Sequence, residues 1–229
     1  MELGLRGGVS TIVKRYAKAN NHYLPDFNPN DRESYLIYLD ANNLYGFGMS
    51  QLLPKCNFKF LSSEEIQNRF TTPMNDLKEI LDNLLGEPIG YMFDVDIEYP
   101  QSLHDQHSDY PLAPEQLHID SSMYSPFMRE HYGKQASSIK LTPNLYNKKN
   151  YIIHINNLAL YLRLGLKVTR INKVISFEQD RWLKPYIDDN TSRRAEATTE
   201  FEKNFFKLMN NIIYGKTCEN LRNKVILRD

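Results

Sequence analysis

The chain has only two cysteines, Cys56 and Cys218, and neither belongs to a paired Cys or His spacing. This scarcity excludes a disulfide framework and a zinc site of the usual ligand pattern. Long apolar runs are also missing, and no basic segment followed by a hydrophobic stretch opens the chain. We therefore expect no membrane span, no secretory signal and an intracellular protein, and leave its compartment open among nucleus, cytoplasm and mitochondrion.

A surplus of charge is missing as well, because 28 Lys and Arg residues balance 28 Asp and Glu residues. A neutral chain is not typical of a simple basic nucleic-acid-binding protein. The balance nevertheless conceals two different halves. Residues 1–139 hold 11 basic and 19 acidic side chains, whereas residues 140–229 hold 17 and 9. This asymmetry indicates that the second part handles phosphates, while the first holds cations or contacts protein.

Helix and strand patterns are mixed along the chain, which predicts an α+β fold. Strict alternation of apolar and polar residues over 90–99 is typical of a half-buried strand. Further strands are expected at 35–39, 151–155 and 168–177. Helices are expected at 9–20, from a capping box at 62–65, at 73–85 before Gly86, from Asn156 to Gly165, and from about Thr191 to Gly215. The stretch Pro100–Ser138 is rich in Pro, His and Ser and is expected to be an irregular insertion.

The segment KLMNNIIYGK, residues 207–216, carries the most distinctive polar pattern. At about 100° per residue, one helical stripe contains Lys203, Lys207, Asn211 and Tyr214, with Arg193 upstream on the same side. Basic stripes usually form a solvated face, and that interpretation stays open. However, apolar residues fill the other sides of the helix, namely Phe205, Leu208, Ile212, Phe206, Met209 and Ile213. A cleft that binds a nucleoside triphosphate is therefore the alternative hypothesis.

Carboxylates provide a second set of candidate site residues. Asp40 follows the apolar run of 35–39, and the end of a buried strand is a common position for a catalytic metal ligand. Asp96 and Glu98 superficially match the Asp-x-Glu element of an editing nuclease, although solvated side chains on a strand face are the more common explanation. His104, Asp105, His107 and Asp109 lack zinc-like regularity and are interpreted as loop residues.

The motifs DANNLYG at Asp40 and KLMNNIIYGK at Lys207 resemble the first two polymerase motifs of family B DNA polymerases. The protein-primed branch is the most similar, especially the members of organellar and viral type found in self-synthesising DNA transposons. RGGVSTIVKRYAKANN at the amino terminus is similar to the glycine-pair segment that precedes the first motif in that branch. The resemblance extends over essentially the whole chain and keeps the order of the motifs.

The resemblance implies a role for each matching residue. Asp40 would be the catalytic metal-binding carboxylate, and the carbonyl group of Ala41 would bind the same Mg²⁺ ion. Tyr45 would lie under the sugar and exclude a 2′-hydroxyl, next to Asn43. The triphosphate and base would be held by Lys203, Lys207, Asn211, Tyr214, Arg193 and Arg194. The template would be contacted by Arg6, Gly7, Gly8, Gly215 and Lys216.

The resemblance also implies a fold and a domain plan. It predicts a partial palm at 1–99, an inserted region at 100–145, a continuation of the palm at 146–180, and helical fingers at 181–229. The implied partners are a DNA template and primer, a dNTP, and a terminal protein that primes synthesis, without a membrane. The implied cofactor is a pair of Mg²⁺ ions.

The third polymerase motif, which would supply a second metal-binding aspartate, does not occur before Asp229. The 229 residues are therefore expected to be a fragment without polymerase activity. A non-catalytic transposon remnant that still binds nucleotide or DNA is the alternative.

Overall fold

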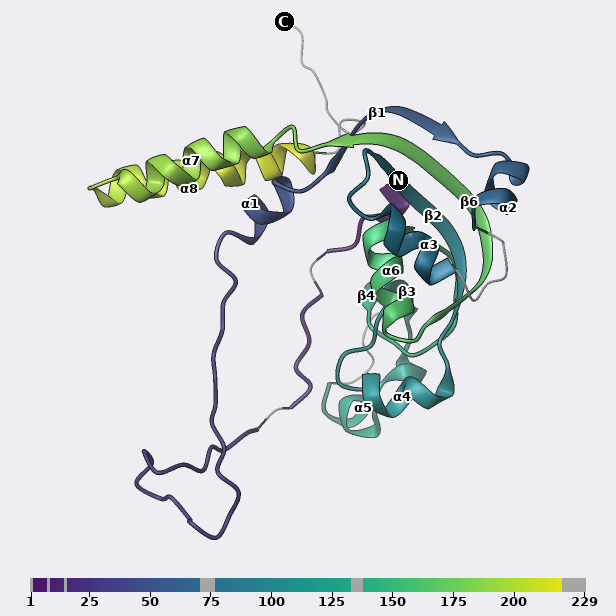
Figure 1. The fold of residues 1–229 in the computed structure, drawn as a ribbon. Coiled ribbons are helices and arrows are strands. Elements are labelled where there is room, and N and C mark those ends of the chain that lie inside the picture. Colours follow the sequence, from purple (N-terminus) through teal and green to yellow (C-terminus); the bar gives the residue numbers. More distant parts are fainter. Residues whose placement is uncertain (1, 8, 15, 71–76, 133–137, 220–229) are drawn as a thin grey trace, which may run out of the picture. The chain divides into compact units, whose positions relative to one another are not determined.

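The computed structural model describes residues 2–7, 9–14, 16–70, 77–132 and 138–219, which form the expected α+β fold (Figure 1). The chain divides into two compact units. The first, here called the sheet unit, consists of Met1–Leu36 and Phe58–Ser176. The second, here called the hairpin unit, consists of Ile37–Asn57 and Phe177–Asp229. The boundaries of palm, insert and fingers remain predictions.

A four-stranded sheet has the order β1-β6-β2-β5, in which β1 is Leu53–Phe60, β6 Lys167–Asp180, β2 Ile89–Glu98 and β5 Lys148–His154. Strands β2 and β5 are antiparallel and pair from Met92 with His154 to Val95 with Tyr151. The register then shifts between Val95 and Ile97. The three strands expected at 90–99, 151–155 and 168–177 are thus confirmed.

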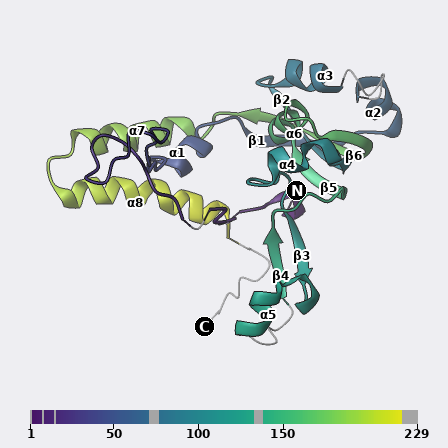
Figure 2. The same ribbon diagram turned by 90° about the horizontal axis from the view of Figure 1, so that it is seen from below.

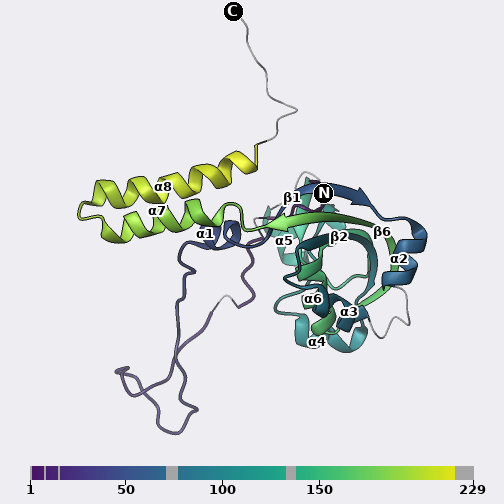
Figure 3. The same ribbon diagram turned by 45° about the horizontal axis from the view of Figure 1, so that its top comes forward.

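The core of the sheet unit lies on one face of β2. The alternating side chains Tyr91, Phe93, Val95, Ile97 and Tyr99 are all buried, as the alternation predicts. They pack in one apolar cluster with residues of α2 (Ser63–Phe70), α3 (Leu77–Leu84) and α6 (Ile155–Arg163). Figure 3 shows β2 and β6 curving around α3 and α6. Burial of this continuous apolar face holds the helices on the sheet.

The ends of these helices follow local hydrogen-bonding rules. The expected capping box precedes α2, because the Ser62 amide donates to Glu65 and the Glu65 amide donates to the Ser62 hydroxyl oxygen. Gly86, with φ of 85°, follows α3, whose expected first residues 73–76 lie outside the described residues. The cap of α6 was expected at Asn156 but is His154, whose Nδ1 accepts the Asn156 amide at 3.2 Å. An imidazole nitrogen thus acts as the N-cap acceptor, a role that Asn and Ser side chains have more often.

The expectation of an irregular region at Pro100–Ser138 is wrong. Its elements are η3 (Gln101–Leu103), α4 (His104–His107), β3 (Glu115–Ile119), η4 (Ser121–Met123) and α5 (Pro126–Tyr132), and β4 (Ser138–Thr142) follows. Strands β3 and β4 form a two-stranded antiparallel sheet, visible side by side in Figure 2. Their pairing is nonlocal, and two five-residue strands carry a weak sequence signal.

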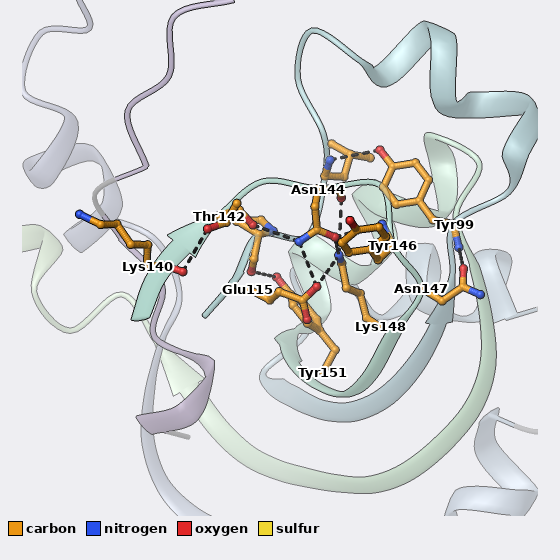
Figure 4. Close-up of polar contacts among 11 residues, drawn as sticks. Tyr99, Glu115, Lys140, Thr142, Asn144, Tyr146, Asn147, Lys148 and Tyr151 are labelled. Carbon is orange, nitrogen blue, oxygen red and sulfur yellow. Dashed lines mark hydrogen bonds and ion pairs between the residues drawn. The ribbon is translucent and has the colours of Figure 1, made fainter. Parts of the chain in front are cut away.

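A buried polar cluster connects β3 to β5 (Figure 4). Lys148 is 1% exposed, and its Nζ lies 2.9 Å from Glu115 Oε1 and also contacts the Asn144 side chain. Burial lowers the pKa of the Lys148 amine, and the Glu115 carboxylate opposes that shift. Nearby, the Tyr151 hydroxyl donates to the Pro114 carbonyl at 3.0 Å. The cluster therefore fixes the beginning of β3 against the main sheet.

The amino-terminal segment also differs from expectation, because residues 9–20 form no helix in their described part. Most of these residues are exposed, and a single helix without a buried face is marginal in water. A loop that follows is closed where Asn20 and Ser34 exchange backbone hydrogen bonds.

The hairpin unit contains α1 (Leu44–Met49), α7 (Lys184–Glu196) and α8 (Glu200–Thr217). Its small buried core consists of Met49, Leu183 and Ile187, with Leu53, Tyr186 and Ile213 packed against it. On α8, the side chains of Phe206, Met209 and Ile213 are half-buried, whereas those of Phe205, Leu208 and Ile212 are exposed. The prediction that both sets would fill the sides of a half-buried helix is therefore only partly correct.

Candidate functional site

A polar cleft of about 700 Å³ lies within the hairpin unit. It combines the segment before and at the start of α1 with one residue of α7 and two of α8. Its lining residues are Asp40, Ala41, Asn42, Asn43, Leu44, Tyr45, Arg194, Lys207 and Asn211. The cleft thus brings together residues about 160 positions apart in the sequence.

Asp40 reaches the cleft from an extended segment and not from the expected strand. Residues 35–39 form no strand, and their side chains are between 53% and 95% exposed. A strand needs a partner for its backbone groups, and none of the described strands pairs with this segment. The apolar run was therefore correctly recognised but wrongly predicted to be buried.

Asn43 and Gly46 form the turn that leads into α1. Asn43 has a left-handed backbone with φ of 52° and precedes the first helical residue. Its side chain lies against Gly46, where an added Cβ would come within 2.3 Å of Asn43 Nδ2. The absence of a side chain at residue 46 therefore gives Asn43 the space to adopt this position.

The carboxy-terminal helix expected from Thr191 to Gly215 is in fact two helices. Helix α7 ends at Glu196, and α8 begins after Thr199, which forms a capping box with Glu202. The Thr199-x-x-Glu202 pattern was the missed signal in the sequence. Helix α8 also continues through Gly215 to Thr217, because Gly215 is tolerated inside a helix.

The helix break changes which cations share a site. Arg193 and Arg194 lie on α7, so the single stripe predicted for Arg193 and the α8 lysines does not exist. Arg194 and Lys207 both line the cleft, and within the described residues neither makes an ion pair. Arg193 instead pairs with Asp189 at 2.8 Å, and Lys203 pairs with Glu200 at 3.3 Å. The free positive charge of the cleft therefore comes from Arg194 and Lys207.

Two aromatic rings stack at the edge of the site. The centroids of Tyr45 and Tyr214 are 4.0 Å apart, and the ring planes differ by 6°. Tyr45 lines the cleft, whereas Tyr214 supports it from α8. The neighbouring Cys218 thiol, together with partial burial, raises the pKa of the Tyr214 phenol. Tyr214 therefore remains neutral well above physiological pH.

The oxygen atoms of Asp40 and Ala41 are hard ligands of the kind Mg²⁺ takes, usually together with substrate phosphates. Among the residues that the structure describes, no cluster of three or more His, Cys, Asp or Glu side chains is arranged to hold a metal. The residues present thus fit a Mg²⁺ ion bound by one carboxylate and by a phosphorylated ligand. They do not form a metal site on their own.

The predicted template-binding residues lie in both units. In the sheet unit, Arg6 donates to the Ile152 carbonyl at 2.6 Å, and its guanidinium lies 3.8 Å above the Tyr151 ring. A Cβ added at Gly7 would meet no other described atom within 4 Å, and Gly8 lies outside the described residues. In the hairpin unit, Gly215 lies within α8, and Lys216 pairs with Glu219.

Two of the other carboxylate and histidine candidates, Asp96 and His107, have structural partners. Asp96 accepts the Asn150 amide at 2.9 Å and bonds with Asn172 and Lys149. The Asn150 amide, as the largest cause, lowers the pKa of the Asp96 carboxyl. His107 is buried, with Nδ1 2.8 Å from the Tyr99 hydroxyl. Asp96 is therefore buried and not solvated, and His104 and His107 belong to α4 and not to a loop, so both of these expectations are corrected.

Asn42 and Leu44 also line the cleft and were not predicted as site residues. Their only signal was adjacency to Asp40 and Tyr45. A buried amide pair between α7 and α8 was not predicted either, because Asn210 lies within the 207–216 motif but outside its polar stripe, and Asn190 lies 20 residues earlier. Within the described residues, no helix is long and apolar enough to cross a membrane.

Comparisons with known proteins identify the family of the chain. Residues 26–227 match the family described as DNA polymerase type B, organellar and viral. No curated protein matches the chain. Among solved structures, the chain is similar to Phi29 DNA polymerase in an orthorhombic crystal form, with 16% identity and a TM-score of 0.43. That similarity covers 79% of this chain and 26% of the other, so the chain spans about a quarter of the length of Phi29 DNA polymerase. Because the family match extends over most of its residues, the chain belongs to the organellar and viral type B DNA polymerases.

Proposed function

We propose that this chain forms the nucleotide-binding part of a DNA-directed DNA polymerase. The enzyme would add deoxynucleotides to a primer 3′-hydroxyl or, at initiation, to a hydroxyl group of a terminal protein. Family membership supports the reaction class. The observation that carries the proposal is the cleft in which Asp40, Tyr45, Arg194, Lys207 and Asn211 converge.

The chemistry of these side chains suits a dNTP. Lys207 and Arg194 supply positive charge that is not neutralised by a carboxylate partner in the described part of the chain, and a triphosphate carries the matching negative charge. Asn211 lies one turn from Lys207 and offers an amide to the sugar or the base. Tyr45, backed by Tyr214, presents a flat surface to the deoxyribose. We assign the exclusion of a 2′-hydroxyl to this surface.

Asp40 and the Ala41 carbonyl would hold Mg²⁺, which when bound neutralises charge on the reacting phosphates. Transfer in this class uses two metal ions and more carboxylates than the single one that lines the cleft. We therefore expect the 229 residues alone to bind a dNTP without incorporating it. Gly215 and Lys216, and Arg6 with its neighbouring glycines, are proposed to contact the template.

Equilibrium binding of a fluorescent dTTP analogue to the purified chain tests the proposal. We expect the chain to bind the triphosphate only with Mg²⁺ and to bind the monophosphate much more weakly. In Asp40→Asn, we expect the affinity no longer to depend on Mg²⁺. Equal affinity for mono- and triphosphate, or an unchanged Mg²⁺ dependence in Asp40→Asn, would contradict it. Asp94→Asn is a suitable control, because Asp94 belongs to the sheet unit and does not line the cleft.

A further inference from the structure

Helices α7 and α8 lie antiparallel and side by side, joined by residues 197–199 (Figure 2). The buried apolar residues of this hairpin, Leu183 and Ile187, occupy the beginning of α7. The remainder of α7 is mostly polar, and the stripe of Phe201, Phe205, Leu208 and Ile212 on α8 is exposed. In the joined part of α8, the described residues Phe206 and Met209 are only half-buried, so the apolar packing that aligns this part is weaker than that at Leu183 and Ile187.

Two asparagines are buried near the middle of the two helices. Asn190 of α7 is 6% exposed and Asn210 of α8 is 5% exposed, and Asn190 Nδ2 donates to Asn210 Oδ1 at 3.1 Å. Burying two amides is costly unless they bond to each other, and the net gain in stability from such a bond is small. A single buried polar contact is, however, an effective way to select one register between two helices.

The cations of the cleft lie one turn away from this amide pair. Arg194 follows Asn190 by four residues on α7, and Lys207 precedes Asn210 by three residues on α8. Because the helices are antiparallel, Arg194 and Lys207 both lie nearer the joined end of the hairpin than the asparagines do. At 1.5 Å per residue, Arg194 lies about 6 Å from Asn190 along α7, and Lys207 about 4.5 Å from Asn210 along α8. A slip of one turn would move Arg194 about 5.4 Å along α8 and away from Lys207.

We propose that the Asn190–Asn210 hydrogen bond sets the register of α7 on α8 and thereby places Arg194 beside Lys207. Neither asparagine lines the cleft, so both are positioning residues. Their effect on ligand binding rests on the proposed nucleotide-binding function. Their effect on the register is independent of that function and is measured separately.

The register is tested with spin labels at Ser192 and Asn204, both exposed, in a cysteine-free background. The parent chain is expected to give one narrow distance distribution. In Asn190→Leu/Asn210→Leu we expect a chain that folds with an equal or higher melting temperature but a shifted or broadened distribution. An unchanged distribution in this folded variant overturns the proposal.

Asn190→Ala/Asn210→Ala removes the hydrogen bond without adding side-chain volume. This variant replaces the leucine variant in the distance measurement if the leucine variant does not fold. If neither double variant folds, the pair is required for stability, and a role limited to register is refuted.

The connection to binding is tested by a double-mutant cycle. In the parent chain, Arg194→Ala is expected to weaken dTTP binding about fivefold or more. In the double-leucine background, the same change is expected to have less than a twofold effect, because Arg194 is already displaced. An equal effect in both backgrounds refutes the positioning role. If the parent chain binds no dTTP, the proposed function is refuted instead. The distances between the spin labels then test the register proposal on their own.

Discussion

Lys207→Ala is the substitution that most clearly separates a binding cleft from a solvated basic stripe. Lys207 lines the cleft and has no ion-pair partner in the described part of the chain. Lys203, one turn earlier on the same helix, does not line the cleft and pairs with Glu200. The two lysines therefore form a matched pair, with the same side chain on the same helix and only one facing the proposed ligand.

The expected magnitude follows from these surroundings. A hydrogen bond between an ammonium group and a phosphate contributes about 1.5–3 kcal/mol, and exposure to water favours the lower part of that range. Removal of Lys207 is therefore expected to weaken dTTP binding by about tenfold to hundredfold. The Lys203–Glu200 pair has side chains 42% and 82% exposed, and such pairs contribute about 0–1 kcal/mol to stability. Lys203→Ala is expected to change dTTP affinity by less than about twofold.

Titration of both variants with fluorescent dTTP in Mg²⁺ measures this difference, and circular dichroism confirms that α8 remains helical. Raising the salt concentration should weaken binding to the parent chain more than binding to Lys207→Ala, since one phosphate contact has been removed. If the two lysine variants bind dTTP equally well, the stripe is only a solvated face and the reasoning fails.

Three further predictions concern the turn, a cap and the buried pair. Gly46→Ala should displace the Asn43 side chain and lower dTTP affinity several-fold, and the same titration should show recovery when Asn43→Gly is added, because Gly tolerates the left-handed backbone at residue 43. Burial lowers the pKa of His154, so the stability contributed by its neutral form should be lost as pH falls below about 6.5. Melting temperatures measured from pH 7.5 to 5 should show this loss of stability, and the loss should be smaller in His154→Asn. If the melting temperature depends on pH equally in both proteins, His154 does not have this role. Glu115→Leu leaves Lys148 buried without its carboxylate and should cost about 3 kcal/mol in urea unfolding, with a much smaller cost when Lys148→Met is added.

Local patterns predicted three strands of the main sheet, β2, β5 and β6, and the helices packed on it, whereas β1 was not predicted. The alternation over 90–99 gave both the strand β2 and its buried face, because period two directly reflects side-chain direction. The pairing of β3 with β4 depends on residues far apart in sequence and was not predicted. The run 35–39 has strand composition, but composition does not provide a pairing partner. The capping box at Thr199 was visible in the sequence and was overlooked.

The candidate site was partly predictable for a similar reason. Motifs identified Asp40, Tyr45, Lys207 and Asn211, and the structure brings these residues to one cleft. The residue spacing was interpreted on one continuous helix, whereas the chain turns back between α7 and α8. This turn places Arg194, rather than Lys203, at that cleft. Ion pairs with near neighbours, such as Lys203 with Glu200, likewise depend on rotamers that a linear pattern does not contain.

A crystal structure of the chain with dTTP and Mg²⁺ would locate the nucleotide. We predict a triphosphate between Arg194 and Lys207, Mg²⁺ bound to Asp40 and the phosphates, and the deoxyribose against Tyr45. A nucleotide bound elsewhere on the chain, or a triphosphate without contact to Lys207, would contradict the assignment of this cleft.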